Sequence, residues 1–241
     1  MGLPKLMHPT FELKVPSTKK MVKFRPFLVK EEKLMLMAKQ SGEQQDIINV
    51  IKQVIVNCDI ENVINSDDLS SFDLEILFLK LRAKSVGEEI KIMYEDLEDE
   101  KQYEFKIDIE DINVYEDPDH SNIIKLTDTS GIIMKYPSAK LMSEIINKEE
   151  ISDILFYMIK GCLDQYYDGD LIVKFSESKQ EEVDGFVDSL PTSTLKEFEK
   201  FFDTMPKLYH KIEFVNQKGT KREIELRTIE DFFSLGWVTV I

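Results

Sequence analysis

The chain has 241 residues, of which 42% are hydrophobic and 32% are charged. A chain of this length buries roughly 70% of the surface that its unfolded form exposes, so its core needs no disulfide or metal. The composition excludes a wholly disordered protein. The net charge of −15 argues against a general nucleic-acid binder, because phosphate contacts require clustered Lys and Arg.

No run approaches the roughly 20 apolar residues that span a bilayer, and no secretory signal is recognisable. We therefore expect a cytoplasmic protein without a membrane partner. The two cysteines, Cys58 and Cys162, lie far apart in segments with helical periodicity. Buried apolar roles are favoured over a disulfide or a catalytic thiol.

Charge is unevenly distributed along the chain. Residues 1–33 hold eight Lys or Arg against three Glu, a balance of +5, which leaves −20 for the remainder. A basic N-terminal segment that includes Lys19, Lys20, Lys23 and Arg25 could dock on an acidic surface, that of its own body included. A simply solvated segment is the alternative interpretation.

The first segment, residues 1–87, is predicted to form a hairpin and a helical bundle. Apolar and polar residues alternate before and after a turn, and the period then becomes helical. Gly42 suits the end of the first helix, and Ser70 with Asp73 forms a capping box at the start of the third. On the first helix, Met37 is expected to face the core. The predicted strands are 11–15 and 22–24, and the predicted helices are 27–40, 46–57 and 70–87.

The second segment, residues 88–137, is predicted to be antiparallel β structure. Alternating Ile90, Ile92 and Tyr94 face a second alternating run across a strongly acidic tip. Two further strands are expected at 123–126 and 132–136.

The third segment, residues 138–241, returns to helices and closes with a hairpin. Thr194 and Glu197 are spaced as a capping box at the start of its last helix. The predicted helices are 139–147, 151–165, 181–190 and a helix from 194 onward, and the predicted strands are 171–175, 211–215 and 222–226. The fold class is therefore α+β, with antiparallel hairpins between helical groups and no Rossmann-type alternation. The three segments could also form one integrated domain.

Nothing in the chain has strong catalytic spacing. It lacks a P-loop, GxGxxG, HExxH and GxSxG, and His8, His120 and His210 lie on expected loops or element ends. We therefore predict no catalytic residue, no cofactor and no metal site.

Two acidic clusters, residues 96–100 and 116–119, are candidate calcium sites. Neither has the order of an EF-hand loop, and solvated loops are favoured. A divalent-cation or nucleotide-dependent enzyme that uses Asp108, Glu110 and Asp111 is the rival from another functional class.

Aromatic residues suggest two further contact regions. Pro26 restricts Arg25, so the segment from Phe24 to Phe27 forms a corner that either presents Phe27 to a partner or fastens the hairpin to the helix. The C-terminal end is apolar and must pack internally or on a partner. Its largest side chains include Phe232, Phe233 and Trp237.

Several strings resemble the T4-type baseplate hub protein and hub assembly catalyst family, from about residue 9 to 234. The string KFRPFLVKEEK, residues 23–33, is the most specific of them. The other matching strings are 9–17, 72–87, 124–128, 134–137, 198–208 and 231–233.

The resemblance implies a protein that helps to build the central hub of a contractile tail. It would act on other hub proteins and the tape-measure protein, either as a transient assembly factor or as a permanent subunit, and its oligomeric state stays open. It names no catalytic residue. On physical grounds, the candidate partner-binding residues are Lys19, Lys20, Lys23, Phe24, Arg25, Pro26, Phe27, Phe232, Phe233 and Trp237.

The resemblance also bears on zinc. In the family that the chain resembles, many members carry paired cysteines in the central hairpin, which would suit a zinc knuckle. This chain has Tyr94-Glu95-Asp96 and Lys101-Gln102-Tyr103 there. We therefore predict that it binds no zinc and that strand pairing alone holds this hairpin.

Overall fold

The computed structural model describes residues 6–41, 43–145, 150–229 and 231–232. Helices and small antiparallel sheets make up this part of the chain, which confirms the predicted α+β class. Two compact units are present: unit 1 combines Met1–Tyr115 with Lys207–Ile241, and unit 2 is Glu116–Pro206. The three-segment division stays a prediction.

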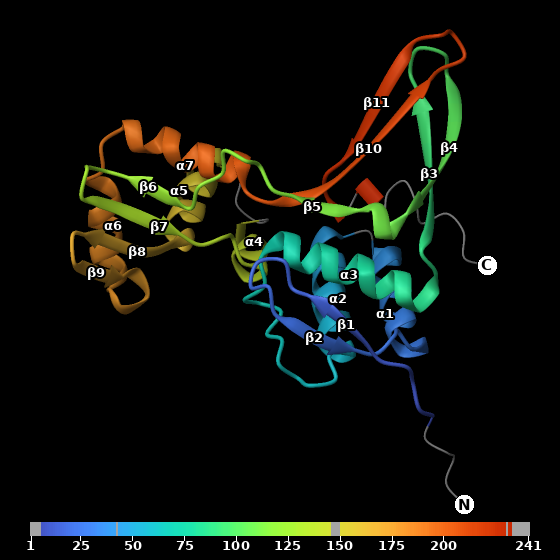
Figure 1. The fold of residues 1–241 in the computed structure, drawn as a ribbon, viewed down its shortest axis with the longest axis horizontal. Helices are drawn as coiled ribbons and strands as arrows, with labels where there is room; N and C mark the ends of the chain where they lie inside the picture. Colours follow the sequence, from blue (N-terminus) through green and yellow to red (C-terminus); the bar gives the residue numbers. More distant parts are fainter. Residues whose placement is uncertain (1–5, 42, 146–149, 230, 233–241) are drawn as a thin grey trace, which may run out of the picture. The chain divides into compact units, whose positions relative to one another are not determined.

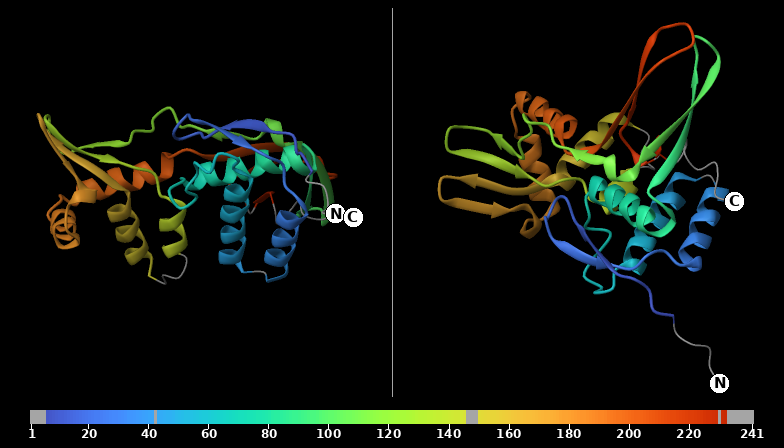
Figure 2. Two further views of the ribbon diagram at one scale, coloured as in Figure 1. Left: turned by 90° about the horizontal axis from the view of Figure 1, so that it is seen from below. Right: turned by 45° about the vertical axis from the view of Figure 1, so that its right-hand side comes forward.

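Unit 1 begins as predicted, with an antiparallel hairpin and three helices. Figure 2 shows α1 and α2 side by side, with α3 lying across their ends. Ser70 caps α3 through the predicted capping box, in which its side chain accepts from the Asp73 N–H. The bounds are β1 (Phe11–Lys14), β2 (Met21–Phe24), α1 (Val29–Ser41), α2 (Gln44–Cys58) and α3 (Ser71–Val86). The predicted cap Gly42 lies outside the described residues.

One prediction about α1 is wrong, because Met37 is exposed. The buried residues of this helix are Glu31, Met35 and Ala38. A carboxylate therefore takes a core position of α1, where a hydrophobic pattern alone cannot place it.

Two long hairpins complete unit 1. The predicted central hairpin is present, and in it Ile90, Ile92 and Tyr94 pair with Ile107, Phe105 and Tyr103. The unpredicted strand β5 pairs with β10, and its three residues are too few to show an alternation. The elements are β3 (Glu89–Asp96), β4 (Lys101–Asp108), η1 (Ile109–Asp111), β5 (Asn113–Tyr115), β10 (Lys207–Val215) and β11 (Lys221–Leu226).

Unit 2 is a four-stranded antiparallel sheet in the order β6-β7-β8-β9. Figure 2 shows α5 and α6 on one side of its strands. The strands are β6 (Ile123–Lys125), β7 (Ser130–Met134), β8 (Leu163–Asp168) and β9 (Leu171–Lys174). The helical elements are α4 (Ala139–Ile145), α5 (Ile151–Cys162), η2 (Phe175–Glu177), α6 (Gln180–Asp188) and α7 (Ser193–Thr204).

Two predictions in unit 2 need correction. The helix expected over 151–165 ends at Cys162, because Leu163 turns extended and pairs with Met134. The Thr194 capping box is also wrong. The N-cap of α7 is Thr192, and Thr194 is buried inside the helix.

Candidate protein-interaction site

Two hairpins of unit 1 rise together and meet at their tips, as Figure 1 shows. We call β3–β4 and β10–β11 with their turns the double-hairpin arm. Within it, β3 pairs with β4 and β10 pairs with β11, while β5 joins β10 near its start. Side chains, and not a shared ladder, must therefore join the two hairpins.

Phe214 of β10 is the centre of the apolar contact between the hairpins. Its ring centroid lies 4.7 Å from that of Tyr103, 5.1 Å from that of Phe105 and 5.8 Å from that of Tyr94. Aromatic pairs at such distances stabilise by about 0.5–1.5 kcal/mol beyond the area that they bury. The period-two pattern of β3 and β4 found these aromatics, but it could not show what they face.

Asp96 is the centre of a polar contact at the tips. Its side chain is 1% exposed. It accepts hydrogen bonds from Arg222 Nε at 2.7 Å and Nη2 at 3.2 Å, and from the Glu98 N–H at 2.7 Å. The hydrogen bonds from Arg222 outweigh the effect of burial and lower the pKa of Asp96 to about 2.

The neighbouring turn residues extend this contact. Asn216 is 3% exposed and donates to the Glu98 carboxylate at 2.7 Å, and Arg222 donates to the same carboxylate at 2.9 Å. The Gln217 N–H donates to Asp99 at 3.0 Å. The hydrogen bond from Asn216 is the largest of the effects that lower the pKa of the Glu98 carboxyl. The prediction that strand pairing alone holds the central hairpin is therefore wrong, and the acidic tip is not simply solvated.

The arm presents apolar side chains at its end. Leu97, in the turn after β3, is 89% exposed, and Val215, at the end of β10, is 58% exposed. A rigid tip with exposed apolar residues is a suitable anchor for a protein partner.

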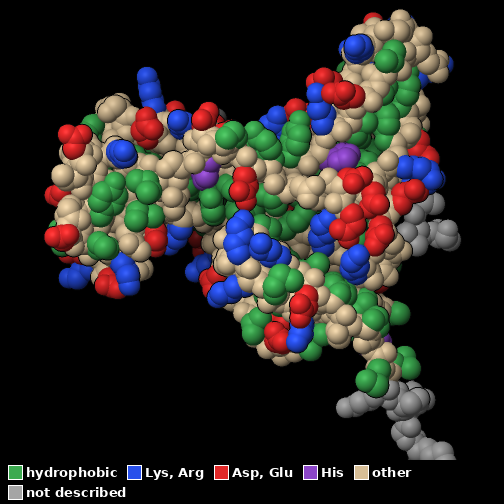
Figure 3. Space-filling model, viewed as in Figure 1, with side chains coloured by type: hydrophobic (Ala, Val, Ile, Leu, Met, Phe, Trp, Pro, Cys, Tyr) green, Lys and Arg blue, Asp and Glu red, His purple; other side chains and the backbone are tan. Residues whose placement is uncertain are grey.

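The β1–β2 turn carries the predicted basic residues. Figure 3 shows blue side chains gathered over this turn. Lys19 and Lys20 are exposed in it, and Lys23 of β2 is exposed beside Glu61 at 3.7 Å. The Ser17 N–H donates to the fully buried Asp73 carboxylate at 2.8 Å, which anchors the turn to α3. No sequence signal linked Ser17 to Asp73.

Arg25 has a different role from these lysines. Its guanidinium donates to both Glu31 carboxylate oxygens, at 3.0 and 3.2 Å, and to the Asn57 carbonyl at 2.8 Å. The Glu31 side chain is fully buried. Burial opposes its ionisation, but the bonds from Arg25 and from the Leu28 N–H prevail and lower its pKa. This arrangement explains the spacing of Arg25 and Glu31 in the string.

The aromatic candidates mostly pack inside unit 1. Phe24 is fully buried, and Phe232 is 2% exposed. The Phe27 ring lies 5.7 Å from that of Phe78 on α3, so it fastens the corner after β2, which Pro26 helps to form, to the helices. The other two aromatic candidates, Phe233 and Trp237, lie outside the described residues.

Two carboxylates of the rival enzyme hypothesis, those of Glu110 and Asp108, already have partners. Glu110 binds Lys80 at 3.0 Å and Lys84 at 3.1 Å, and these lysines lower its pKa. Asp108 accepts the Glu110 N–H at 2.8 Å. In the described part of the chain, no group of three or more His, Cys, Asp or Glu is placed to hold a metal ion.

His120 and the two cysteines have structural surroundings. His120 lies between the Thr204 hydroxyl at 3.0 Å and the Tyr136 hydroxyl at 3.1 Å, and burial lowers its pKa. Cys58 and Cys162 are free and buried, which confirms the expectation for them.

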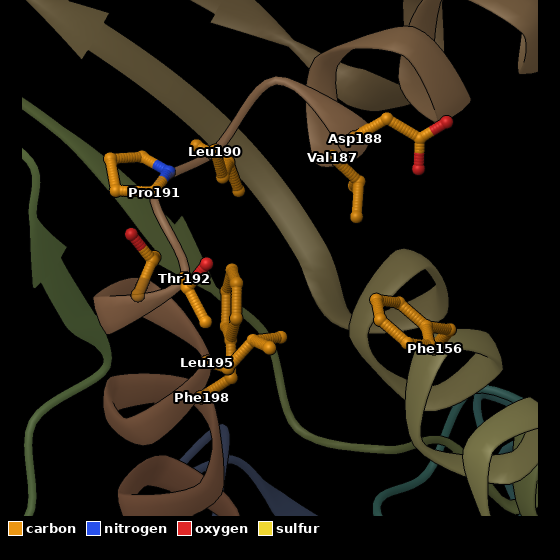
Figure 4. Close-up of a pocket in the computed structure, with 9 residues that line it drawn as sticks. Phe156, Val187, Asp188, Leu190, Pro191, Thr192, Leu195 and Phe198 are labelled. Carbon is orange, nitrogen blue, oxygen red and sulfur yellow. The ribbon is translucent and has the colours of Figure 1, made fainter.

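Unit 2 has an apolar groove of about 340 Å³. Figure 4 shows Phe156 of α5 facing Leu195 and Phe198 of α7 across it. Leu190 and Pro191 line it from the segment between α6 and α7. Asp188, Thr192 and Thr194 add polar groups to the lining, and mostly apolar walls with a few polar groups are typical of ligand grooves.

The chain was compared with known sequence families. The family described as T4 bacteriophage base plate protein matches residues 8–234. The chain belongs to this family. The predicted resemblance is thus confirmed at the level of the base plate protein family, over most of the chain. No curated protein and no solved structure matches this base plate protein. Among the helices that the structure describes, none is long and apolar enough to cross a bilayer.

Proposed function

We propose that this base plate protein acts at the hub of a contractile phage tail, through protein contacts and without turnover. Its partners are other hub proteins and the tape-measure protein. It meets them in the host cytoplasm while tails are being built. Membership of the base plate protein family carries this proposal, since the match extends over residues 8–234.

The double-hairpin arm supports the proposal physically. Arg222 and Asp96 hold two tips together that would otherwise move separately, so a partner meets a preorganised surface. Leu97 supplies an exposed apolar anchor there. The lysines of the β1–β2 turn add an electrostatic contribution, which speeds association with an acidic partner more than it raises affinity.

Two modes remain within this proposal, transient assembly factor and permanent hub subunit. Both use the same kind of surface. We favour the assembly factor as the first hypothesis and the permanent subunit as its alternative. The abundance of the protein in finished particles separates them.

A capture experiment tests the arm directly. Leu97→Asp, made in the tagged full chain, should reduce recovery of hub and tape-measure proteins from infected cells by at least about tenfold, because a central anchor contributes more than 1.4 kcal/mol. Quantitative mass spectrometry of the captured proteins gives the result.

Val63→Asp is the matched control. Val63 is 62% exposed on a loop after α2, away from the arm, so the same change of charge and polarity should leave capture unchanged. Equal recovery with wild type and Leu97→Asp would reject the arm as the contact surface, and equal loss in both variants would reject its specificity.

A further inference from the structure

Strand β9 forms an edge of the sheet in unit 2. Figure 1 shows it outermost, beside β8. Its Leu171, Ile172 and Val173 are 56%, 62% and 38% exposed. Three consecutive exposed aliphatic residues on an edge strand are unusual, since an unpaired edge readily accepts another strand.

Several of the usual protections against edge pairing are missing from this strand, although it is short and carries one lysine. Prolines, bulges and charges that point inward normally block an edge. The sequence Leu171–Lys174 contains no proline, and its pairing with β8 runs without a register shift. Its only charged residue, Lys174, stands at the end of the strand.

The turn between β8 and β9 determines which backbone groups of β9 point away from β8. Asp168 pairs with Leu171, and Gly169 has φ 57°, so a two-residue turn joins β8 to β9. In such a hairpin the closing pair is hydrogen-bonded, and the pairs alternate after it. Leu171 and Val173 therefore bond to β8, while the N–H and C=O of Ile172 face outward.

The sequence around Ile172 complements itself. In an antiparallel pair of two copies centred on Ile172, Leu171 lies opposite Val173 of the second copy. Asp170 lies opposite Lys174 of the second copy, so opposite charges meet on both sides of the centre. The centre also uses the outward backbone groups of Ile172. In the described structure Lys174 has an ion pair with Glu177 at 3.6 Å, which is exposed and can be exchanged.

We propose that β9 pairs with β9 of a second copy about a two-fold axis at Ile172, which makes one eight-stranded sheet. Opposite side chains of an antiparallel pair share a face, so the helices of both copies lie on the same side. The inference does not depend on the proposed function. The interface is small, so the dimer forms only at high concentration or in an assembly that raises the local concentration.

Charge reversal tests the register. Sedimentation of the full chain from about 1 µM to about 500 µM should show a monomer–dimer equilibrium. Asp170→Lys and Lys174→Asp should each weaken dimerisation about tenfold, because each places like charges opposite one another at two points. The double variant should restore it.

Cross-linking tests the centre independently. Ile172→Cys should form a disulfide-linked dimer under mild oxidation, because the two new thiols meet at the axis. The natural cysteines are buried and do not compete. Val63→Cys, at another aliphatic position that is 62% exposed like Ile172, gives the collisional background.

A chain that stays monomeric at every concentration, with equal cross-linking at both positions, overturns the proposal. Dimerisation that neither charge reversal weakens overturns it too, because the contact then lies elsewhere.

Discussion

Glu31 is a charged residue in the place of a core hydrophobe. It is fully buried on α1, where Arg25 and the Leu28 N–H satisfy its carboxylate. The hydrophobic pattern of α1 therefore gave a wrong prediction for Met37. The buried position of Glu31 depends on its contact with Arg25, which the pattern does not contain. Buried ion pairs of this kind favour one packing arrangement, and removing one partner is costly.

Glu31→Ala should lower the free energy of unfolding by about 3 kcal/mol, because it leaves the Arg25 guanidinium without a counter-ion beside the core. Chemical denaturation measures the change. Lys30→Ala is the control. Lys30 also lies near this carboxylate, at 3.4 Å, but its side chain is 62% exposed, so its loss should cost little. A loss as small as that of the control would show that Arg25 finds other partners.

The lowered pKa of Asp96 predicts that the contact between the two hairpin tips is lost in acid. The pKa of this side chain falls from 3.8 to about 2 on folding, so its contribution to stability is complete above pH 4 and disappears as pH falls towards 2. Nuclear magnetic resonance of the Arg222 Nε–H, which donates to Asp96 at 2.7 Å, should report loosening in this range. Asp96→Asn should remove that transition, and an unchanged acid transition in the variant would contradict the assignment.

Among the elements, the arm was only half predictable from sequence. Alternation predicted both hairpins, because period two is a local property. The partnership of Phe214 with the aromatics of the other hairpin was not visible, since residues more than a hundred positions apart carry it. β5 was missed because three residues are too few to show an alternation, and the first residues of β8 were read as the end of a helix.

Phe214→Ala should loosen the arm without unfolding the helices. We expect a local loss of about 2 kcal/mol, which is below the cost in a full core because Phe214 is only half-buried. Hydrogen exchange should speed up in β10 and β11 while protection in α3 stays unchanged. Faster exchange throughout unit 1 would mean that the arm is part of the core and not a separate element.

Gly131 of β7 allows the strands of unit 2 to approach. A Cβ at this position would lie 2.6 Å from the Ile124 carbonyl oxygen, which belongs to backbone and cannot turn aside. Gly131→Ala should cost about 1–3 kcal/mol as an overpacked site. Thermal unfolding measures it, with Gly185→Ala as the control because that site is open. Equal midpoints in the two variants would show that the strand shifts freely.

At the scale of the whole molecule, the chain leaves unit 1 at Tyr115 and returns at Lys207. Unit 2 is therefore continuous in sequence, with its own apolar cluster that includes Ile132, Phe198 and Phe201. Composition predicted enough core for such a fold, but no local signal shows that the last hairpin belongs with the first helices. That grouping depends on long-range contacts.

Residues 116–206 should fold when expressed alone, because their strands and core are complete within the segment. Circular dichroism and a cooperative thermal transition test this. A segment without a cooperative transition would show that unit 2 depends on unit 1 for its stability.

The central claim is that this family member works in the baseplate by binding other tail proteins. The most direct test combines capture of the tagged protein from infected cells, before tails are complete, with quantitative mass spectrometry of purified particles. We predict capture of hub and tape-measure proteins together with near absence from particles. Stoichiometric presence in particles would instead identify a permanent hub subunit, and finding neither association would contradict the account.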